Sequence, residues 1–338
     1  VEFSDAISTW QDLKGLIQFN NGQFTSRVEK NRVYLYPDNP VKGELWVSVE
    51  PGIQNAKGDA LKNRLSEKLV FTSQKPQVRF SGKGVILPGN KRLTIPFEAI
   101  NVSSVQVTAF RIYADNMGQF LQTNALSGDQ DLQRVGRHLW RKTVHFSAVR
   151  NDKWNPYALD VSELIKKYPH GMFRLSLSIH RANSTYECSA EEKQTTIPPE
   201  NPLQDANDVT FQEVSSWDYV QDYFGVDNDS STWPDRDNPC KDAYFRYAQG
   251  VQSSRNFMSS NIGLIAKSDA GGSMHVIATD LRSSEPLAGV KISFFNYQNQ
   301  ITANSVTDAR GFAQIHLPTP AFYLLAENNK DIAYLKLN

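Results

Sequence analysis

The sequence predicts an all-β protein made of tandem antiparallel β-sandwich domains with one irregular insertion. The clearest sign lies in residues 263–338, where short alternating runs are separated by turn residues. Val290, Ile292 and Phe294 fall on one face of such a run, and polar residues occupy the other face. This period of two is typical of a half-buried strand. Several runs of this kind within roughly 75 residues indicate a small sandwich, which we expect over 259–338.

The first segment has its own strand pattern. Residues 32–36 and 44–49 alternate between apolar and polar side chains, and the turn residues at 38–40 separate them. A Pro-Gly turn at 51–52 follows, and then a closing run at 68–72. This order resembles the bacterial Ig-like module. We therefore expect a first sandwich domain over residues 1–75.

A second sandwich domain is expected over residues 76–185. Residues 105–113, 139–146 and 172–179 alternate as strands do. Between the last two runs, residues 162–167 give the one clear helix signal, preceded by Asp160 as the expected N-cap. Another short helical turn is expected at 117–121.

The alternation is lost in residues 186–258, where turn residues and Asp, Asn and Ser dominate. A solvated linker is one interpretation. The segment carries too many aromatic residues for that, so we expect an ordered excursion that packs against a neighbouring domain. Its aromatic cluster is a candidate docking surface, made of Trp217, Tyr219, Tyr223, Phe224 and Trp233.

The two cysteines, Cys188 and Cys240, lie at the two ends of this excursion. Two buried thiols, a partial metal site or a disulfide would each fit an isolated pair. A zinc site would need further His or Cys ligands nearby, and no His or further Cys lies between them. Because the pair is about 50 residues apart, a bridge could stabilise the fold by roughly 4 kcal/mol. We predict a disulfide, and with it an oxidising compartment.

Acidic residues near Asp227 and Asp229 raise the question of a calcium loop. An EF-hand loop that began at Asp227 would need Gly at its sixth position and an acid at its twelfth. Those positions hold Thr232 and Asn238. A solvated acidic loop is therefore favoured over a bound divalent ion, and no metal or other cofactor is predicted.

Composition excludes several classes of function. Lys and Arg together number 36, as do Asp and Glu, so there is no electrostatic basis for binding nucleic acid or an anionic membrane surface. No apolar run approaches the roughly 18 residues that a membrane-spanning helix needs. The chain starts at Val1 without a signal segment, as expected of a mature protein or a piece of one. The histidines are scattered outside known catalytic motifs, so we do not expect an enzyme.

Several short motifs, in a fixed order, carry a resemblance to a known family. They are Asn-Pro-Cys at 238–240, Ile-Gly-Leu-Ile-Ala-Lys at 262–267, Thr-Asp-Leu-Arg at 279–282 and Pro-Leu-Ala-Gly-Val at 286–290. The helix and turn at 159–171 are similar to those of a macroglobulin domain. This succession resembles the amino-terminal part of the bacterial alpha-2-macroglobulins. The resemblance covers nearly the whole chain and is sharpest over residues 240–311.

The resemblance implies a function for the whole family. Its members are long chains of macroglobulin-like sandwiches in the bacterial periplasm, often lipid-anchored. A protease that cuts their bait region is entrapped by the rearrangement that follows. This chain would then be a scaffold fragment of a broad-spectrum endopeptidase inhibitor. Its partners would be other domains of the same long chain and, through the full-length protein, target proteases. Any membrane attachment would come from a lipid anchor outside the fragment.

Many family members also form a thioester between the Cys and the Gln of a Cys-x-Glu-Gln motif. Here the four residues that begin with Cys188 end in Glu191 instead of Gln, and a carboxylate cannot lose ammonia to form that link. We therefore expect neither thioester nor bait region in this fragment. Two rival interpretations stay open, namely a surface adhesion or glycan-binding array of Ig-like modules, and accessory domains of an envelope enzyme.

Overall fold

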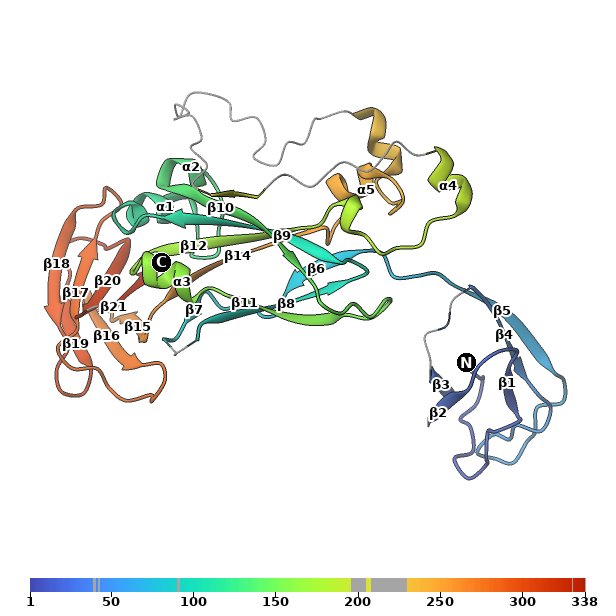
Figure 1. Cartoon of the computed structure of the whole chain (residues 1–338). Coiled ribbons are helices and arrows are strands. Elements are labelled where there is room, and N and C mark those ends of the chain that lie inside the picture. Colours follow the sequence, from blue (N-terminus) through green and yellow to red (C-terminus); the bar gives the residue numbers. More distant parts are fainter. Residues whose placement is uncertain are drawn as a thin grey trace. The chain divides into compact units, whose positions relative to one another are not determined.

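The computed structural model describes residues 1–338 except 39–40, 42, 90–91, 196–204, 208–229, 330 and 338. The chain forms two compact units, Val1–Gln74 and Lys75–Asn338 (Figure 1). Strands dominate both units, and antiparallel sheets pack face to face, so the predicted all-β fold of tandem sandwiches is confirmed. Within the described residues, no helix combines the length and the hydropathy needed to cross a bilayer.

The first unit contains a three-stranded sheet and a separate hairpin. The sheet has the order β1-β4-β5 and the hairpin joins β2 to β3. Their bounds are β1 (Ile17–Phe19), β2 (Phe24–Glu29), β3 (Arg32–Pro37), β4 (Gly43–Val49) and β5 (Leu65–Phe71). The core of the unit is small. Among its described residues it comprises eight buried hydrophobic side chains, which are Ile7, Leu13, Ile17, Val33, Leu45, Val47, Val49 and Ile53.

The second unit begins with a sandwich of two sheets, which we call the middle sandwich. Its six-stranded sheet comprises, in spatial order, β13 (Ala206–Asn207), β10 (Gly136–His145), β9 (Ser104–Ile112), β12 (Met172–Ser178), β14 (Gln252–Ser259) and β7 (Ile86–Leu87). Its three-stranded sheet comprises β11 (Asn155–Asp160), β8 (Thr94–Ile100) and β6 (Gln77–Phe80).

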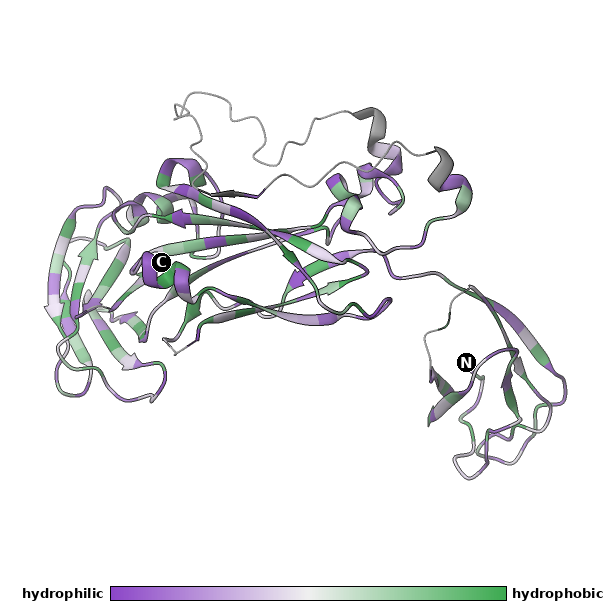
Figure 2. Ribbon diagram, in the orientation of Figure 1, coloured by the Kyte–Doolittle hydropathy of each residue, from purple (hydrophilic) through white to green (hydrophobic). Residues whose placement is uncertain are grey.

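Alternating side chains from the two sheets meet in the core of the middle sandwich. Val105 and Val107 of β9 and Leu175 of β12 face Ile95 and Phe97 of β8, and all five are buried. Figure 2 shows hydrophobic and hydrophilic segments alternating along these strands. The alternation seen in the sequence at 105–113 and 172–179 therefore corresponds to real strands with one face in this core.

Strand β14 corrects the sequence-based interpretation, which treated the whole of 186–258 as irregular. The strand pairs with β12 from Gln252 to Met258 and with β7 at its end. Its first residues, Gln252 to Arg255, are polar on both faces, so the period-two signal is missing there. The buried Asn256 is held instead by hydrogen bonds, because its amide donates to the carbonyls of Leu126 and Gly128. This strand is therefore held partly by polar contacts, and it lacks the alternation of apolar residues by which a strand is recognised in a sequence.

The helices are short and lie between strands. The predicted helix at 162–167 is present as α3 (Ser162–Lys167). Asp160 accepts a hydrogen bond from the backbone of Ser162, although Val161 holds the N-cap position one residue later. The expected turn at 117–121 is α1 (Met117–Thr123). Further helical segments are η1 (Ala114–Asn116), α2 (Leu132–Val135), η2 (Arg181–Asn183), α4 (Ala190–Thr195), η3 (Ser230–Asp235) and α5 (Asp242–Tyr247).

A second sandwich, the C-terminal sandwich, completes this unit. One sheet comprises β15 (Ile262–Ser268), β16 (Ser273–Asp280) and β19 (Phe312–His316). The other comprises β18 (Ile301–Val306), β17 (Lys291–Phe295), β20 (Tyr323–Asn328) and β21 (Asp331–Lys336). Val290, Ile292 and Phe294 point into its core, as the sequence predicts.

The tight turn predicted at residues 307–311 is also present. The Asp308 carboxylate accepts hydrogen bonds from the backbone N–H groups of Arg310 and Phe312. Gly311 has a φ of +69°, and a Cβ there would lie 2.4 Å from the carbonyl oxygen of Ala278. Only glycine fits both the conformation and the space.

Candidate functional site

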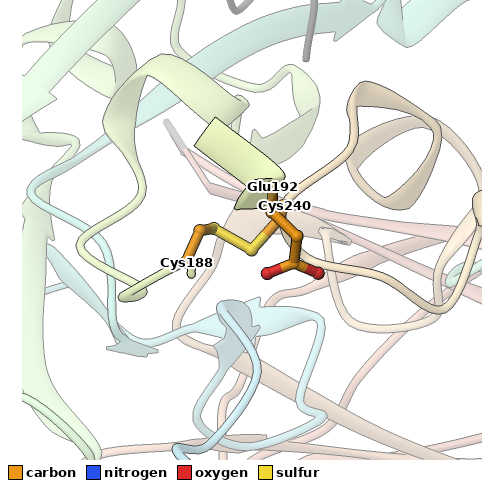
Figure 3. Close-up of side chains that lie close together, drawn as sticks. All are labelled: Cys188, Glu192 and Cys240. Atoms are coloured by element: carbon orange, nitrogen blue, oxygen red, sulfur yellow. A yellow bond between two sulfur atoms is a disulfide. The ribbon is translucent and has the colours of Figure 1, made fainter. Parts of the chain in front are cut away.

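Cys188 and Cys240, which are 52 positions apart in the chain, form a disulfide with Cα atoms 5.8 Å apart. That separation is within the ordinary range for a bridge. Cys188 lies just before α4 and Cys240 just before α5 (Figure 3). The bridge therefore joins the two ends of the aromatic excursion, and it closes the long loop that contains the residues between them.

Glu192 of α4 lies beside the bridge and organises the polypeptide around it (Figure 3). Its carboxylate accepts hydrogen bonds from the backbone and hydroxyl of Ser189, while the Ser189 hydroxyl accepts one from the Glu192 backbone. This reciprocal pattern is a capping box that fixes the start of α4. The Asn238 amide donates to the same carboxylate at 3.1 Å, and these bonds lower the pKa of Glu192. Asn238 also accepts a hydrogen bond from the backbone of Cys240.

The sulfur atoms of Cys188 and Cys240 and a carboxylate oxygen of Glu192 lie within 4.8 Å of one another. A soft metal ion would bind thiolates, but in the disulfide each sulfur is bonded to the other. The oxidised site thus offers a single carboxylate, which is a poor donor set for a metal. In the acidic loop, Asp227 and Asp229 lie outside the described residues, so their predicted lack of a bound ion stays a prediction.

Helix α5 anchors the cysteine-bearing segment in the middle sandwich. Tyr244 and Phe245 are buried in the sandwich core. The Tyr244 hydroxyl donates a 2.9 Å hydrogen bond to the carbonyl of Pro76, and burial raises the pKa of Tyr244 to about 12. Asp242 pairs with Arg181 at 3.4 Å, and both side chains are largely shielded from solvent. The segment beyond Cys240 is therefore part of the sandwich and not a tether.

The candidate docking surface is described only in part. Trp217, Tyr219, Tyr223 and Phe224 lie outside the described residues, so their docking role stays a prediction. Trp233, within η3, is half exposed and contacts the ring of Tyr247 with centroids 5.2 Å apart. The Arg236 guanidinium lies over the Trp233 ring, 4.8 Å from its centroid. One member of the predicted surface is thus held in place with an exposed indole.

A second feature was not predicted from the sequence. It is a hydrophobic core shared by the two sandwiches of the second unit, which we call the junction core. Strand β9 is buried on both faces, and the face turned away from the middle-sandwich core carries Phe110 and Ile112. These residues pack with α1 and with two tyrosines of the C-terminal sandwich. The junction core comprises Phe110, Ile112, Met117, Phe120, Leu121, Val135, Met172, Met258, Tyr323 and Tyr334.

Polar contacts surround the junction core. The ammonium group of Lys336 donates to the backbone carbonyls of Leu121 and Asn124, at 2.7 and 3.0 Å. The Gln122 amide donates to the carbonyl of Tyr297 at 2.6 Å. A Cβ on Gly118 would lie 2.1 Å from the side-chain oxygen of Asn299, so α1 approaches the C-terminal sandwich as closely as glycine allows.

The connection between the two sandwiches consists of Ser260 and Asn261, which separate β14 from β15. Ser260 is buried, and its backbone donates to the carbonyl of Leu87. The Asn261 backbone donates to the carboxylate of Asp331, and its side chain accepts from the backbone of Gly89. Both residues are therefore fixed by partners in the two sandwiches, and neither has the freedom of a hinge residue.

Two models of one protein family match the chain. The model of the bacterial alpha-2-macroglobulin MG2 domain matches residues 79–191, and that of the MG3 domain matches 259–338. Together they cover more than half of the chain. No curated protein sequence matches it.

Solved structures agree with the fold. A crystal structure of native alpha-2-macroglobulin from Escherichia coli spanning domains MG0-NIE-MG1 is similar, with 16% identity and a TM-score of 0.56 over 100% of this chain and 90% of that one. A cryo-EM reconstruction of the native Escherichia coli protein gives 15% identity and a TM-score of 0.51. That match covers 99% of this chain, which spans 18% of the Escherichia coli chain.

Proposed function

Because this chain belongs to the bacterial alpha-2-macroglobulins, we propose that it is an amino-terminal scaffold of a broad-spectrum protease trap of the cell envelope. Its role is architectural: it holds other domains of the same long chain in fixed positions. Target proteases would meet it only through the full-length protein. Neither catalysis nor protease inhibition would reside in this part alone.

The junction core is the observation that carries this proposal. Two sandwiches that share buried side chains, including Phe120, Tyr323 and Tyr334, cannot rotate against each other without exposing them. Independent domains on a string would instead meet through small, polar and hydrated contacts. A trap that must rearrange in a defined way when cut needs some parts that keep their shape, and residues 75–338 fit that role.

Within the scaffold we propose sandwich domains at 1–75, 76–185 and 259–338, joined by the excursion at 186–258. Strand β14 closes the middle sandwich, although it comes at the end of the excursion. The exposed ring of Trp233, backed by Arg236, supports the excursion as the surface that meets neighbouring domains. The disulfide is stable only in an oxidising compartment, which supports a periplasmic location.

The isolated chain tests the proposal directly. It would be incubated with several endoproteases, and cleavage of a large protein substrate would then be followed. We expect the proteases to keep full activity on that substrate. Stoichiometric protection of the substrate would contradict the proposal, because it would place inhibition in this part of the protein.

The scaffold role itself needs the intact parent protein. Gly118→Ala would disturb the junction core, because the new Cβ would lie 2.1 Å from the side-chain oxygen of Asn299. We expect the parent protein with this substitution to be cut by proteases at a normal rate and to retain them less well. Unchanged retention, with a demonstrably loosened junction, would show that the rigid connection is not needed for trapping.

A further inference from the structure

The first unit contains a large apolar cavity between its two sheets. Its volume is about 610 Å³, and its lining includes Val33, Leu35, Leu45, Leu65, Leu69 and Phe71. Protein interiors are normally packed to the density of organic crystals and hold few voids larger than a water molecule. The described part of this unit has eight buried core residues, so a cavity of this size indicates that an element is missing from the sandwich.

The cavity is open on one side, above strand β5. The inward-facing residues of β4 (Leu45, Val47 and Val49) are at most 6% exposed. Among the residues that line the cavity from the next strand, β5, Leu65 and Leu69 are 57% and 41% exposed. The hairpin β2–β3 therefore covers β4 and leaves the inner face of β5 exposed to solvent. Strand β3 contributes to the lining, so the vacant place lies beside β3 and opposite β5.

The free edge of β3 already carries the beginning of a strand. Val33 and Val1 exchange two backbone hydrogen bonds of 2.8 Å, and Glu2 and Arg32 form an antiparallel bridge. In an antiparallel ladder the backbone groups of alternate residues point to the same edge. Leu35, two residues beyond Val33, thus turns its N–H and C=O toward the vacant place, and no described residue supplies a backbone partner there.

We propose that a strand of polypeptide covalently continuous with Val1 occupies this place and completes the sandwich. The register is set by the pair of Val1 and Val33, so the residue two positions before Val1 would pair with Leu35. Val1 lines the cavity, and so would every second residue before it. The occupant is therefore an extended segment with apolar side chains at those positions. The proposal does not depend on the protease-trap function.

Backbone geometry favours a strand over a small apolar ligand. A bound small molecule could fill the cavity, but it could not satisfy the N–H and C=O of Leu35 at strand spacing. An added strand does both, because it pairs with β3 and covers Leu65, Leu69 and Phe71 at once. It would also protect the free edge of β3, which would otherwise invite pairing with other chains.

Two extended versions of the whole chain test the proposal. Each carries six residues before Val1, alternately Thr and Val. In the first version, Val stands two, four and six positions before Val1 and faces the cavity. In the second, the order is reversed, so that the composition is identical and Val faces outward. Hydrogen exchange of the Leu35 amide and fluorescence of an apolar dye, 1-anilinonaphthalene-8-sulfonate, are measured in both versions and in the original chain.

We expect the first version alone to slow exchange at Leu35 at least tenfold and to lower dye binding. The amide of Val47, in the middle of β4, should be protected in all three chains and shows that the unit is folded. Equal behaviour of the two versions, or no protection in either, would overturn the proposal. So would equal protection of the original chain by a separately added peptide of the first sequence, because the occupant would then need no link to Val1.

Discussion

The ammonium group of Lys336, in the last strand, donates a 2.7 Å hydrogen bond to the backbone carbonyl of Leu121, which precedes it by 215 positions. A second bond reaches the carbonyl of Asn124. Both carbonyls belong to the end of α1, where a helix leaves its last carbonyl groups without intrahelical partners. A cation at this end also interacts favourably with the helix dipole. One side chain thus ties strand β21 to the helix that borders the junction core.

Lys336→Met should weaken this connection. Loss of two charge-assisted hydrogen bonds should cost about 1–3 kcal/mol and speed hydrogen exchange at the end of α1. The control is Lys291→Met, an exposed lysine of the same sandwich. If both variants leave exchange in α1 unchanged, Lys336 contributes nothing to the junction.

Gly118→Ala should destabilise the junction by steric conflict. The new methyl group would overlap the side chain of Asn299, at a cost of about 1–3 kcal/mol. Asn299 has a φ of +62°, which glycine adopts readily, so Asn299→Gly removes the obstacle without backbone strain.

The double variant provides the control. Gly118→Ala with Asn299→Gly should be more stable than the sum of the two single effects predicts, as measured by thermal melting. Strict additivity would contradict the contact, because residues that touch are expected to couple.

Breaking the disulfide should loosen one region first. Replacing both cysteines with alanine should lower the stability by up to about 4 kcal/mol, because the unfolded chain regains the freedom of a long loop. Hydrogen exchange should speed up around α4 and before α5, and remain slow in β17 and β20. Simultaneous loss of protection in the C-terminal sandwich would show that the bridge supports the whole unit.

His138 should make the middle sandwich sensitive to acid. Its side chain is buried, and burial, with a contribution from Arg141, lowers the pKa of His138 to about 4. The unfolded histidine titrates near 6.5, so between pH 6.5 and 4 the unfolded chain binds more protons than the folded one. Stability should therefore fall as the pH drops through this window, by up to roughly 3 kcal/mol.

The matched variants for this prediction are His138→Gln and His316→Gln. The first should flatten the pH dependence of the melting temperature between pH 6.5 and 4. The second changes an exposed histidine and should leave the profile as it is. A profile that keeps its slope in His138→Gln would assign the acid sensitivity to other groups.

Local patterns in the sequence were enough to predict many of the strands, although not β14. Ile292 and Phe294 of β17 and the preceding Val290 alternate with polar residues because they face the same core, and the Asp308 turn carries its own hydrogen bonds. The pairing of Cys188 with Cys240 needed no more than their number and their context. The strand and turn patterns depend on residues that are close together in the sequence. The disulfide could be predicted because the chain has no other cysteine.

The junction core could not be predicted in this way. Phe110 and Ile112 lie on the outer face of β9, and nothing in the sequence tells whether such a face meets solvent, a helix or another sandwich. Tyr323 and Tyr334 reach it from more than 200 positions away. The same limit applies to β14, where the buried Asn256 gains its stability from carbonyls of a distant loop.

The two-residue connection through Ser260 and Asn261 also bears on how such chains can change during evolution. A domain that is joined to its neighbours by a flexible linker can be duplicated, lost or exchanged as an independent unit. Here an insertion between β14 and β15 would separate Ser260 and Asn261 from their hydrogen-bond partners. Removal of either sandwich would expose Phe110 or Tyr334 to solvent. Residues 75–338 should therefore be inherited as one block, with length variation confined to the outer loops.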